Sequence, residues 1–518
     1  MHWLALHLPQ LSLETFAATL NAPQRIAPLA LAAQHRIVAV NAAAAEAGVR
    51  PGLKRATALA LAPALRLGQA DGARDAAALQ SVAHVALAFT PMVALDAGPA
   101  TALLELSMVL RYHGGPARLR AKLRDALAPL GHRVQAAAAP TAAGAALLAR
   151  WGRAAHDDLQ AGPHTTELAA LRTLLDAAPV ALLGPGREHW EALQGMGLHR
   201  LADLRALPRS GLARRFGESL LHELDRARGD APDPREPLQL PAVFEGRLEL
   251  HMRADTSDQV LHGAGVLLAR LIAWAQARRA RIAAFTLRMQ HERLRRADAD
   301  DAAAPHTDLK IELAEPGADA AQLRLLLRER LAHCPLPAPT LALRLLCRHW
   351  VQAEAPSGEL FASRQSQHEG LLRLLERLRA RLGDAQVQRL EPLADHRPEH
   401  ASRLQAGAPG ECARLQAAPS MQETRGTPSP AGGALPLHRP AWLLPVPQAL
   451  AERGALPLLA GRALQILSGP ERIEAGWWDS GLAARDYFIA RDEDGALVWV
   501  YRTRLATPGG WFLQGRFG

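Results

Sequence analysis

The sequence predicts an α+β protein of several domains, and three observations support this class. The chain has 518 residues, more than one hydrophobic core usually organises, so three or four domains are expected. Residues 246–350 change between strand-like and helix-like periodicity in the order β-α-β-β-α-β, the split ferredoxin-like arrangement. The last segment, 442–518, is rich in Trp, Tyr and Phe and contains short strand patterns, which predict a small β-rich module.

The charge of the chain suits a polyanionic partner. The formal net charge is +9, and nearly all of the basic residues are arginine. Guanidinium groups pair bidentately with phosphate, so nucleic acid is a reasonable partner. A GC-rich genome would produce the same arginine excess, so the charge alone does not identify the partner.

Cysteine usage and hydropathy argue against several classes of protein. The three cysteines, Cys334, Cys347 and Cys412, are widely spaced and predict neither a disulfide framework nor a zinc site, and no cofactor is expected. No run of about 18 apolar residues is present that could span a bilayer. Polar residues interrupt the apolar N-terminus and no basic region precedes it, which argues against a signal peptide. We therefore expect a cytoplasmic protein without membrane contact.

Short strands and helices alternate in the first 165 residues. The stretch Trp3–Glu14 begins as an apolar strand and turns at a proline into a helical pattern. Arg36–Asn41 alternates like a strand and leads into an alanine-rich helix that ends near Gly48. Thr101–Arg111 and His132–Ala139 predict two further strands. These patterns predict a small sheet accompanied by helices.

Residues 182–204 predict a helix-hairpin-helix element. The hairpin is Gly195-Met196-Gly197, and leucines flank it on both sides. Glycines at such a turn let backbone N–H groups approach a DNA phosphate without a side chain in the way. A Gly-x-Gly pair alone is most often an ordinary turn, but the flanking leucines make the pattern more specific. We therefore expect DNA contacts at Gly195 and Gly197.

Arginines cluster at the end of the first helix of the β-α-β-β-α-β segment and in its second strand. One interpretation is a DNA-binding surface, because arginines on a compact fold often contact phosphates. The alternative is an ordinary solvated face. The predicted DNA-binding arginines are Arg278, Arg279, Arg281, Arg288 and Arg293.

The order of these elements resembles the Y-family, or translesion, DNA polymerases. The first palm strand of that family carries Asp-x-Asp, whose aspartates hold the catalytic magnesium ions; the corresponding residues here are His7 and Pro9. The second palm strand carries Asp-Glu, and alignment on the following Leu-Asp step places Leu106 and Ser107 at that pair. Magnesium prefers carboxylate and other oxygen ligands, so these four residues predict no catalytic site.

The family's triphosphate ligands are also absent from the sequence. Its fingers helix carries Tyr-x-x-Arg, and those positions align with Ala42 and Ala45. Its phosphate-binding lysine aligns with Ala142. Alanine offers no side-chain donor to a phosphate oxygen. The resemblance therefore implies a frame that binds no nucleotide at these positions.

Three interpretations of the palm remain open. The favoured one is a non-enzymatic polymerase frame in which His7 is a hydrogen-bonded core residue rather than a metal ligand. The second is an active translesion polymerase with displaced ligands, in which Glu14 and Glu105 form an unusual carboxylate pair. The third is a plain structural DNA-binding protein, which leaves the aromatic C-terminal segment without a role.

The loop at 355–361 resembles a bacterial clamp-binding peptide, Gln-x-x-Leu-Phe. It keeps the two apolar residues as Leu360 and Phe361 but has lost the glutamine. In the alternative interpretation the pair caps the following helix. A second candidate for clamp binding is Gln239-Leu240-Pro241 in the preceding linker.

Two further stretches, 393–399 and 468–479, resemble the non-catalytic Y-family homologues of bacterial mutagenic repair systems. The resemblance implies an SOS-induced, nucleoid-associated adaptor without polymerase activity. Its implied partners are DNA, the sliding clamp (beta subunit), the RecA-like protein ImuA and an error-prone C-family DNA polymerase. Trp477 and Trp478 are predicted partner-binding residues, because Trp is enriched at binding hot spots, although core packing is the alternative.

The predicted domains follow from these elements and from the resemblance. They are palm and fingers (1–165, fingers about 20–80), thumb (166–230), little finger (242–352), clamp-binding loop and helix (353–398), flexible linker (399–440) and C-terminal β-rich module (441–518).

Overall fold

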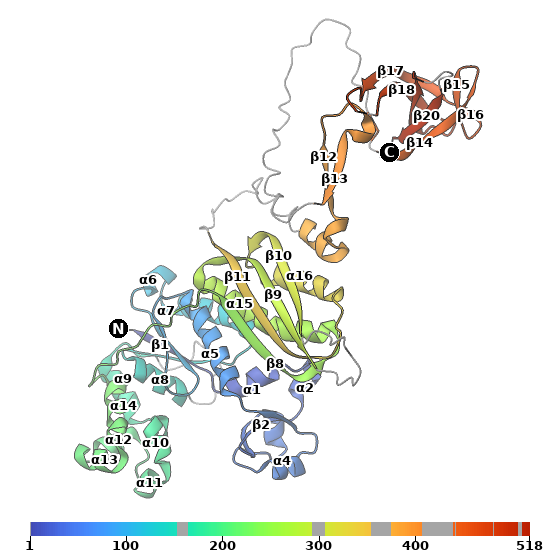
Figure 1. Cartoon of the computed structure of the whole chain (residues 1–518). Coiled ribbons are helices and arrows are strands. Elements are labelled where there is room, and N and C mark those ends of the chain that lie inside the picture. Colours follow the sequence, from blue (N-terminus) through green and yellow to red (C-terminus); the bar gives the residue numbers. More distant parts are fainter. Residues whose placement is uncertain are drawn as a thin grey trace. The chain divides into compact units, whose positions relative to one another are not determined.

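The predicted fold class is confirmed by the structure, a computed structural model of the chain (Figure 1). The chain forms two compact units, Met1–Arg381 and Leu382–Gly518, which are described separately. The structure describes residues 2–152, 164–292, 306–353, 374–406, 439–440, 442–479, 481–505 and 510–517.

A four-stranded antiparallel sheet, the palm-like sheet, lies at the centre of the first unit. Its strands are β1 (Trp3–His7), β5 (Val93–Leu95), β6 (Thr101–Glu105) and β7 (Gln135–Ala139), in the order β5-β6-β1-β7. Helices α5 (Gly72–Leu87) and α7 (Pro116–Leu127) pack on the face that carries Leu4 and Leu6. Helix α8 (Ala142–Trp151) covers the other face. Because both faces are covered, β1 is continuously apolar rather than alternating.

The second palm strand is shorter than the sequence predicts. It ends at Glu105, and residues 110–113 form helix α6 (Leu110–His113) instead of continuing the strand to Arg111. Gly114 then stops this helix with a left-handed φ of 78°.

A small fingers-like sheet has its own core. It contains β2 (Leu29–Ala33), β3 (Arg36–Val40) and β4 (Arg66–Gln69) in the order β3-β2-β4, packed against α3 (Ala42–Glu46) and α4 (Arg55–Leu61). Helices α1 (Leu11–Ala17) and α2 (Ala22–Ile26) connect it to β1.

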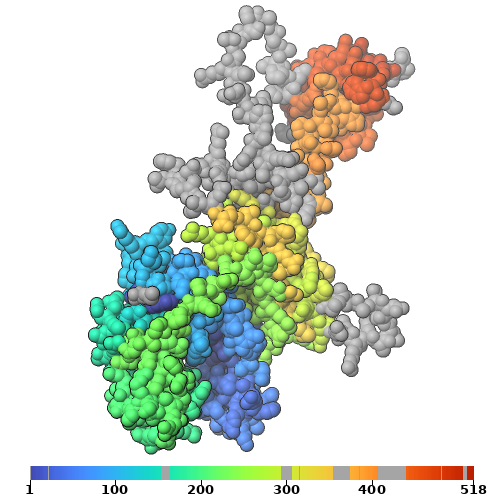
Figure 2. Space-filling model, turned by 60° about the vertical axis from the view of Figure 1, so that its left-hand side comes forward, coloured from blue at the N-terminus to red at the C-terminus, as the bar shows by residue number. Residues whose placement is uncertain are grey.

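Six short helices form the thumb-like region. Their leucines share one core with α8, including Leu193, Leu201 and Leu224. In Figure 2 this region (green) and the fingers-like region (blue) form separate lobes on either side of a hollow. The helices are α9 (Leu168–Asp176), α10 (Gly184–Glu188), α11 (Trp190–Gly195), α12 (Leu201–Arg205), α13 (Arg209–Phe216) and α14 (Glu218–Arg228).

The predicted β-α-β-β-α-β segment, the little-finger-like region, is present in full. Its strands pair antiparallel in the order β10-β9-β11-β8, and both helices pack on one face of the sheet. Its elements are β8 (Phe244–Ala254), α15 (Ser257–Arg278), β9 (Ala280–His291), β10 (His306–Gly317), α16 (Ala320–Ala332) and β11 (Thr340–Gln352).

Helix α15 is the one helix in the described part of the chain that is long and apolar enough to cross a membrane by length and composition. Leu267, Leu271 and Trp274 on this helix are fully buried against the little-finger-like sheet and its neighbours. Its apolar character is therefore that of a core helix.

The second unit is built mainly from one curved, seven-stranded antiparallel sheet with apolar clusters around Trp499 and Trp511. A separate pair, β12 (Gln388–Pro392) and β13 (Ser402–Ala406), precedes it; β13 lies inside the stretch predicted as a linker, so residues 402–406 belong to a β-hairpin. The sheet contains β14 (Trp442–Arg453), β15 (Leu456–Leu459), β16 (Arg462–Ala463), β17 (Gln465–Ala475), β18 (Ala483–Arg491), β19 (Leu497–Thr503) and β20 (Trp511–Arg516).

Candidate functional site

His7 is a hydrogen-bonded residue of the palm-like sheet. Its Nδ1 lies 3.1 Å from Thr101 Oγ1, and that hydroxyl donates to the carbonyl oxygen of Pro99 at 2.7 Å. Because the hydroxyl proton is used on Pro99, Thr101 accepts a hydrogen bond from the His7 ring. Burial, and secondly the positive charge of Arg150, lower the pKa of His7 to about 4, so the ring is neutral at pH 7.

The strand register corrects the predicted position of the second degenerate pair. His7 pairs with Thr101, whereas Trp3 pairs with Glu105. Leu106 and Ser107 follow Glu105 and bond to His2, so they lie about 17 Å or more along the strand from His7, at ~3.3 Å per residue. The residue opposite His7 is therefore Thr101. The physical reason is that the hairpin between β5 and β6 sets the register, which a motif alignment cannot see.

The two carboxylates considered as displaced ligands lie at opposite ends of the palm-like sheet. Glu105 accepts the backbone N–H of Ser107 at 3.0 Å beside the Trp3 end of β1. Glu14 instead accepts the backbone N–H of Arg133 and lies 3.4 Å from His132, just before the strand that pairs with His7. The structure does not bring these carboxylates together.

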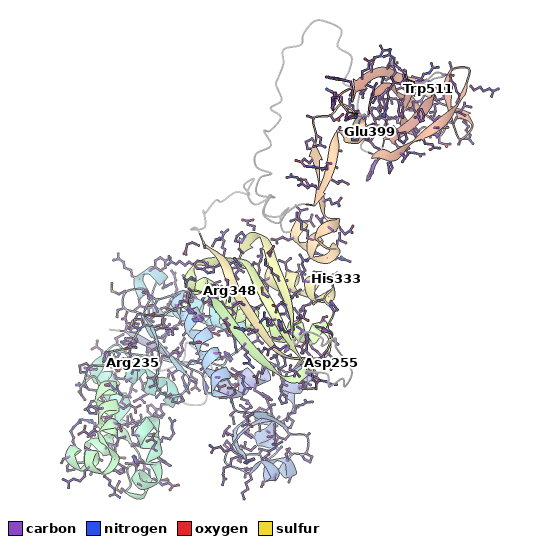
Figure 3. The ribbon with its side chains drawn as sticks, in the orientation of Figure 1. Arg235, Asp255, His333, Arg348, Glu399 and Trp511 are labelled. Carbon is purple, nitrogen blue, oxygen red and sulfur yellow. The ribbon has the colours of Figure 1, made fainter. Side chains whose placement is uncertain are left out.

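A buried ion cluster lies close to His7, and sequence reasoning missed it. Asp96 pairs with Arg150 and, at 2.8 Å, with Arg235, which also contacts Asp233 at 3.0 Å. Burial lowers the pKa of Arg150 to about 10, which still leaves it charged at pH 7. Arg235 follows Asp96 by 139 positions in the chain, so no local pattern marks the cluster. Figure 3 labels Arg235 in this part of the first unit.

The cluster has a consequence for metal binding. The Asp96 carboxylate near His7 is paired with Arg150 and Arg235, so it is not free to hold a divalent cation. Among the residues that the structure describes, no group of three or more His, Cys, Asp or Glu side chains could hold a metal ion.

The predicted nucleotide positions carry only methyl groups. Ala42 is exposed at the start of α3, where the Asn41 side chain caps the helix. Ala45 is half-buried on the same helix. Ala142 is buried at the start of α8, below the cap formed by Thr141. None of these side chains offers a donor to a phosphate.

The thumb hairpin forms, but its backbone donors are already used. The N–H groups of Met196, Gly197 and Leu198 donate to Leu193 or Gln194 within the hairpin, and Gly197 has a left-handed φ of 77°. The next two N–H groups, at residues 199 and 200, both donate to the Asp203 carboxylate, and these bonds lower the pKa of Asp203. The DNA contacts expected at Gly195 and Gly197 stay a prediction, and a phosphate would have to compete with these internal bonds for the Gly197 N–H.

Most of the predicted little-finger arginines are engaged within the protein. Arg288 makes a bidentate pair with Asp308, with two distances of 2.7 Å. Arg281 lies 4.0 Å from Glu315. Arg278 stacks over Trp350 at 4.5 Å and donates to a backbone carbonyl.

Arg279 is exposed and holds the left-handed position, φ 51°, that ends α15. Arg293 lies outside the described residues.

The two clamp-binding candidates differ in what the structure says of them. Leu360 and Phe361 lie outside the described residues. Leu240 packs against the little-finger core, and the Pro241 carbonyl accepts a hydrogen bond from Trp274 Nε1 at 2.9 Å. The 239–241 stretch is thus packed in the fold and is poorly suited to bind in a pocket of the clamp.

In the second unit, Arg397 joins the two stretches that the sequence singled out. Its guanidinium contacts Asp395 and Asp479, each at 2.7 Å, and donates to the Gly481 carbonyl at 3.0 Å. Two residues further along, Glu399 pairs with Arg485, and Figure 3 shows Glu399 within this unit. The hydrogen bonds from Arg397 lower the pKa of Asp395 to about 2, so this linkage persists until the pH falls through that value.

The predicted partner-binding tryptophans are exposed, and core packing does not explain them. Trp477 is 79% exposed and Trp478 is 54% exposed. Their rings make an edge-to-face pair with centroids 5.5 Å apart, and Arg397 lies over the Trp478 ring at 5.7 Å. The core of this unit is built instead from other aromatics, including Tyr487 and Trp499.

The palm-like sheet, the thumb-like helices and the ferredoxin-like little-finger-like region define a Y-family polymerase-like protein, here with His7 and Thr101 in the palm. The chain is 30% identical over 498 residues to Protein ImuB from two strains of Caulobacter vibrioides, across 91% of this chain and 100% of the relative. The chain belongs to the ImuB family. No family model matches the sequence.

Two solved structures are also similar over 67% of this chain and 98% of theirs. They are a Dbh ternary complex, with 14% identity and a TM-score of 0.36, and a Y-family DNA polymerase chimera of Dbh and Dpo4, with 15% identity and a TM-score of 0.36.

Proposed function

We propose that this protein is a catalytically inactive, Y-family polymerase-like adaptor in SOS-induced, error-prone translesion DNA synthesis. The observation that carries the proposal is the neutral His7, bonded to Thr101 where the family holds a magnesium-binding aspartate. The nearby carboxylate of Asp96 is paired with Arg150 and Arg235, so it is not free to replace that aspartate. Two-metal nucleotidyl transfer needs carboxylates that bridge two magnesium ions, and this arrangement offers none at His7 or Thr101.

Primer extension tests the inactivity. We expect the purified full chain to extend no primer on a DNA template with either magnesium or manganese, in reactions where an active Y-family polymerase extends the same substrate. Template-dependent extension that disappears on Glu105→Ala would restore the alternative, an active polymerase with atypical metal ligands. Glu105 is the informative position because it is the carboxylate on the second palm strand.

We also propose that the chain binds DNA without sequence preference through its little-finger-like region. Arg279 and Arg281 are exposed and are the proposed phosphate contacts, whereas the Arg288 guanidinium is paired with Asp308. On the face of this sheet away from its two helices, Arg344 also forms an ion pair with Glu245 at 2.6 Å. Several arginines on this face are paired with carboxylates, so a DNA phosphate must displace a carboxylate before it can pair with one of these arginines. We therefore expect DNA binding to be weak and sensitive to salt.

The salt dependence of DNA affinity tests this proposal. We expect Arg279→Gln with Arg281→Gln to flatten the log–log plot of affinity against salt by about 0.9 for each phosphate that the variant no longer neutralises. The charge-neutral control is Arg288→Gln with Asp308→Asn, which removes a matched pair. An unchanged slope in the first variant would assign Arg279 and Arg281 to the solvated face, and equal flattening in the control would show that Arg288 also contacts phosphate.

The proposed partners are the sliding clamp, a RecA-like ImuA and an error-prone C-family polymerase, and the proposed compartment is the cytoplasm, at the nucleoid. Membership of the ImuB family supports this assembly. The clamp would bind Leu360 and Phe361. The exposed Trp477–Trp478 pair suits a protein contact, because large aromatic side chains left in solvent are frequent interface anchors.

A further inference from the structure

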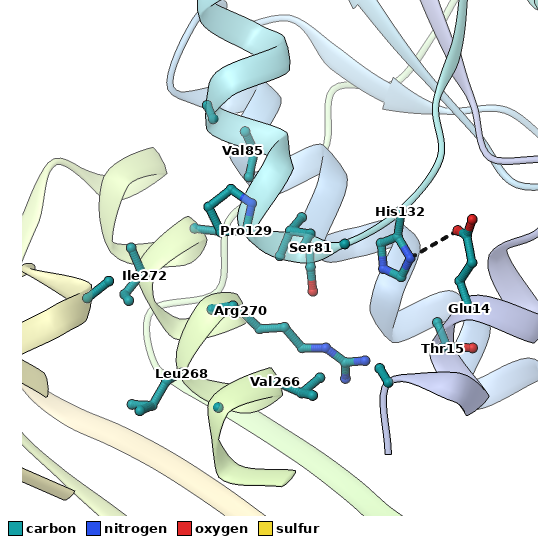
Figure 4. Close-up of a pocket in the computed structure, with 18 of the residues that line it drawn as sticks. Glu14, Thr15, Ser81, Val85, Pro129, His132, Val266, Leu268, Arg270 and Ile272 are labelled. Carbon is teal, nitrogen blue, oxygen red and sulfur yellow. Dashed lines mark ion pairs between the residues drawn. The ribbon is translucent and has the colours of Figure 1, made fainter. Parts of the chain in front are cut away.

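A cavity of about 870 Å³ lies within the first unit, between the palm helices and the little-finger helices (Figure 4). Helices α1, α5 and the turn at 128–132 form one side, and α15 with the start of α16 forms the other. Its volume falls in the range of small-molecule sites, about 300–1,000 Å³. The cavity is remote from the palm residues His7 and Thr101, which do not line it.

Arg270 of α15 extends into this cavity, toward the wall that carries Glu14, Thr15 and His132 (Figure 4). The residue is 6% exposed. Among the described residues, none makes a hydrogen bond or an ion pair with its guanidinium. Burial lowers the pKa of Arg270, and Arg74 adds a second positive charge nearby. A buried guanidinium without a partner is costly, so such a group usually has an anionic partner when the protein functions.

The other charged groups of the cavity do not neutralise Arg270. Glu14 already accepts two hydrogen bonds from the Arg133 N–H and faces His132 at 3.4 Å. Arg25 is itself a cation and donates to the backbone carbonyls of Leu20 and Ala18. Asp125 lies at the mouth with a side chain that is 71% exposed.

His132 supplies a second polar atom that lacks a hydrogen bond. Its side chain is 8% exposed, and its buried Nδ1 lies 3.4 Å from the Glu14 carboxylate but makes no hydrogen bond in the described part of the chain. Thr15 also lines the cavity, but its hydroxyl donates to the Ser12 carbonyl at 3.0 Å. The wall also includes apolar side chains, among them Val85, Leu130 and Leu268, and the polar residues Ser81, His262, Gln276 and Arg324. The cavity thus combines a buried cation with apolar surface.

We propose that this cavity binds a small organic oxyanion, a molecule whose phosphate or carboxylate group pairs with Arg270 while its apolar part lies against α5 and α15. A planar guanidinium matches both oxyanions bidentately, so the shared chemistry is the oxyanion. Residues from the palm side and the little-finger side would contact the same ligand, which would hold the two sets of helices together. This inference does not rest on the proposed polymerase-like function.

Thermal unfolding of the full chain tests the proposal with three probes: inorganic phosphate, deoxyadenosine monophosphate and benzoate. We expect at least one probe to raise the Tm in a saturable way, because a ligand that binds only the native state stabilises it. Phosphate alone would indicate a bare anion site, the nucleotide a phosphate ester, and benzoate a carboxylate with an apolar body. No saturable shift with any of the three overturns the proposal.

Arg270→Met supplies the decisive variant. In buffer without a probe its Tm should equal or exceed that of the unaltered protein, because a desolvated charge has been removed. Its affinity for the active probe should fall about tenfold or more, as expected when a charged hydrogen bond is removed. The matched control is Arg328→Met, an exposed arginine on α16 that does not line the cavity and should leave affinity unchanged. Equal affinity in Arg270→Met, or a fall in its Tm without a probe, would assign Arg270 a structural role only.

Discussion

The double variant Leu360→Ala with Phe361→Ala is expected to lose binding to the bacterial sliding clamp while keeping its fold and its DNA affinity. The sequence around these residues resembles a clamp-binding peptide, in which the Leu and Phe side chains fill an apolar pocket. Burying both side chains contributes on the order of 3–6 kcal/mol, and ordering the loop offsets part of it. We therefore expect a weak, exchangeable contact that is lost when both side chains are removed. Surface plasmon resonance on immobilised clamp measures the loss directly.

A matched control separates this contact from nonspecific adhesion of exposed apolar side chains. Leu390 and Leu404 are cross-strand neighbours on β12 and β13, with 65% and 63% exposure. Replacing both with alanine removes a comparable apolar area and should leave clamp binding unchanged. If the Leu360/Phe361 variant still bound the clamp, the docking peptide would lie elsewhere. The 239–241 stretch is then a poor substitute, because Leu240 packs in the little-finger core.

Replacing Trp477 and Trp478 together with alanine should remove most of the capture of partner proteins by the second unit. Both rings are exposed, and truncating one tryptophan at the centre of an interface typically costs about 2 kcal/mol or more. Loss of both rings therefore predicts a decrease in affinity on the order of several hundredfold. The measurement is co-purification of ImuA and the C-family polymerase with the tagged full chain from DNA-damaged cells, quantified against the unaltered protein.

The matched control is Trp442→Ala, which removes a tryptophan that is 73% exposed in the same unit. It should keep both partners. Arg397 lies over the Trp478 ring, so far-UV circular dichroism and melting of each variant must show that the second unit stays folded. Full partner capture by a folded Trp477/Trp478 variant would contradict the role assigned to this pair.

The sequence by itself determined the elements with strong periodicity. The β-α-β-β-α-β order expected over residues 246–350 is found in the structure, and its two helices are α15 (Ser257–Arg278) and α16 (Ala320–Ala332). Local hydrophobic spacing is enough to predict these elements because each of them buries one face against the others. The residues that must be apolar for packing are therefore the residues that show the periodic pattern.

The sequence also determined that the palm has no carboxylate at His7, because residue identity needs no structure. It could not determine which residue lies opposite. The register that pairs His7 with Thr101 rather than with Leu106 depends on where the β5–β6 hairpin turns, and shifting a strand changes every cross-strand neighbour.

Only the tertiary structure decided the contacts between residues far apart in the chain. It joined Arg397 to Asp479, placed Arg150 near His7, and left Arg270 buried in a cavity without a partner among the described residues. The sequence alone does not show whether an arginine side chain will face solvent, a carboxylate or a cavity. Its role depends on which charges and how much water surround it after folding, because both the electrostatic energy and the desolvation cost are set by those neighbours.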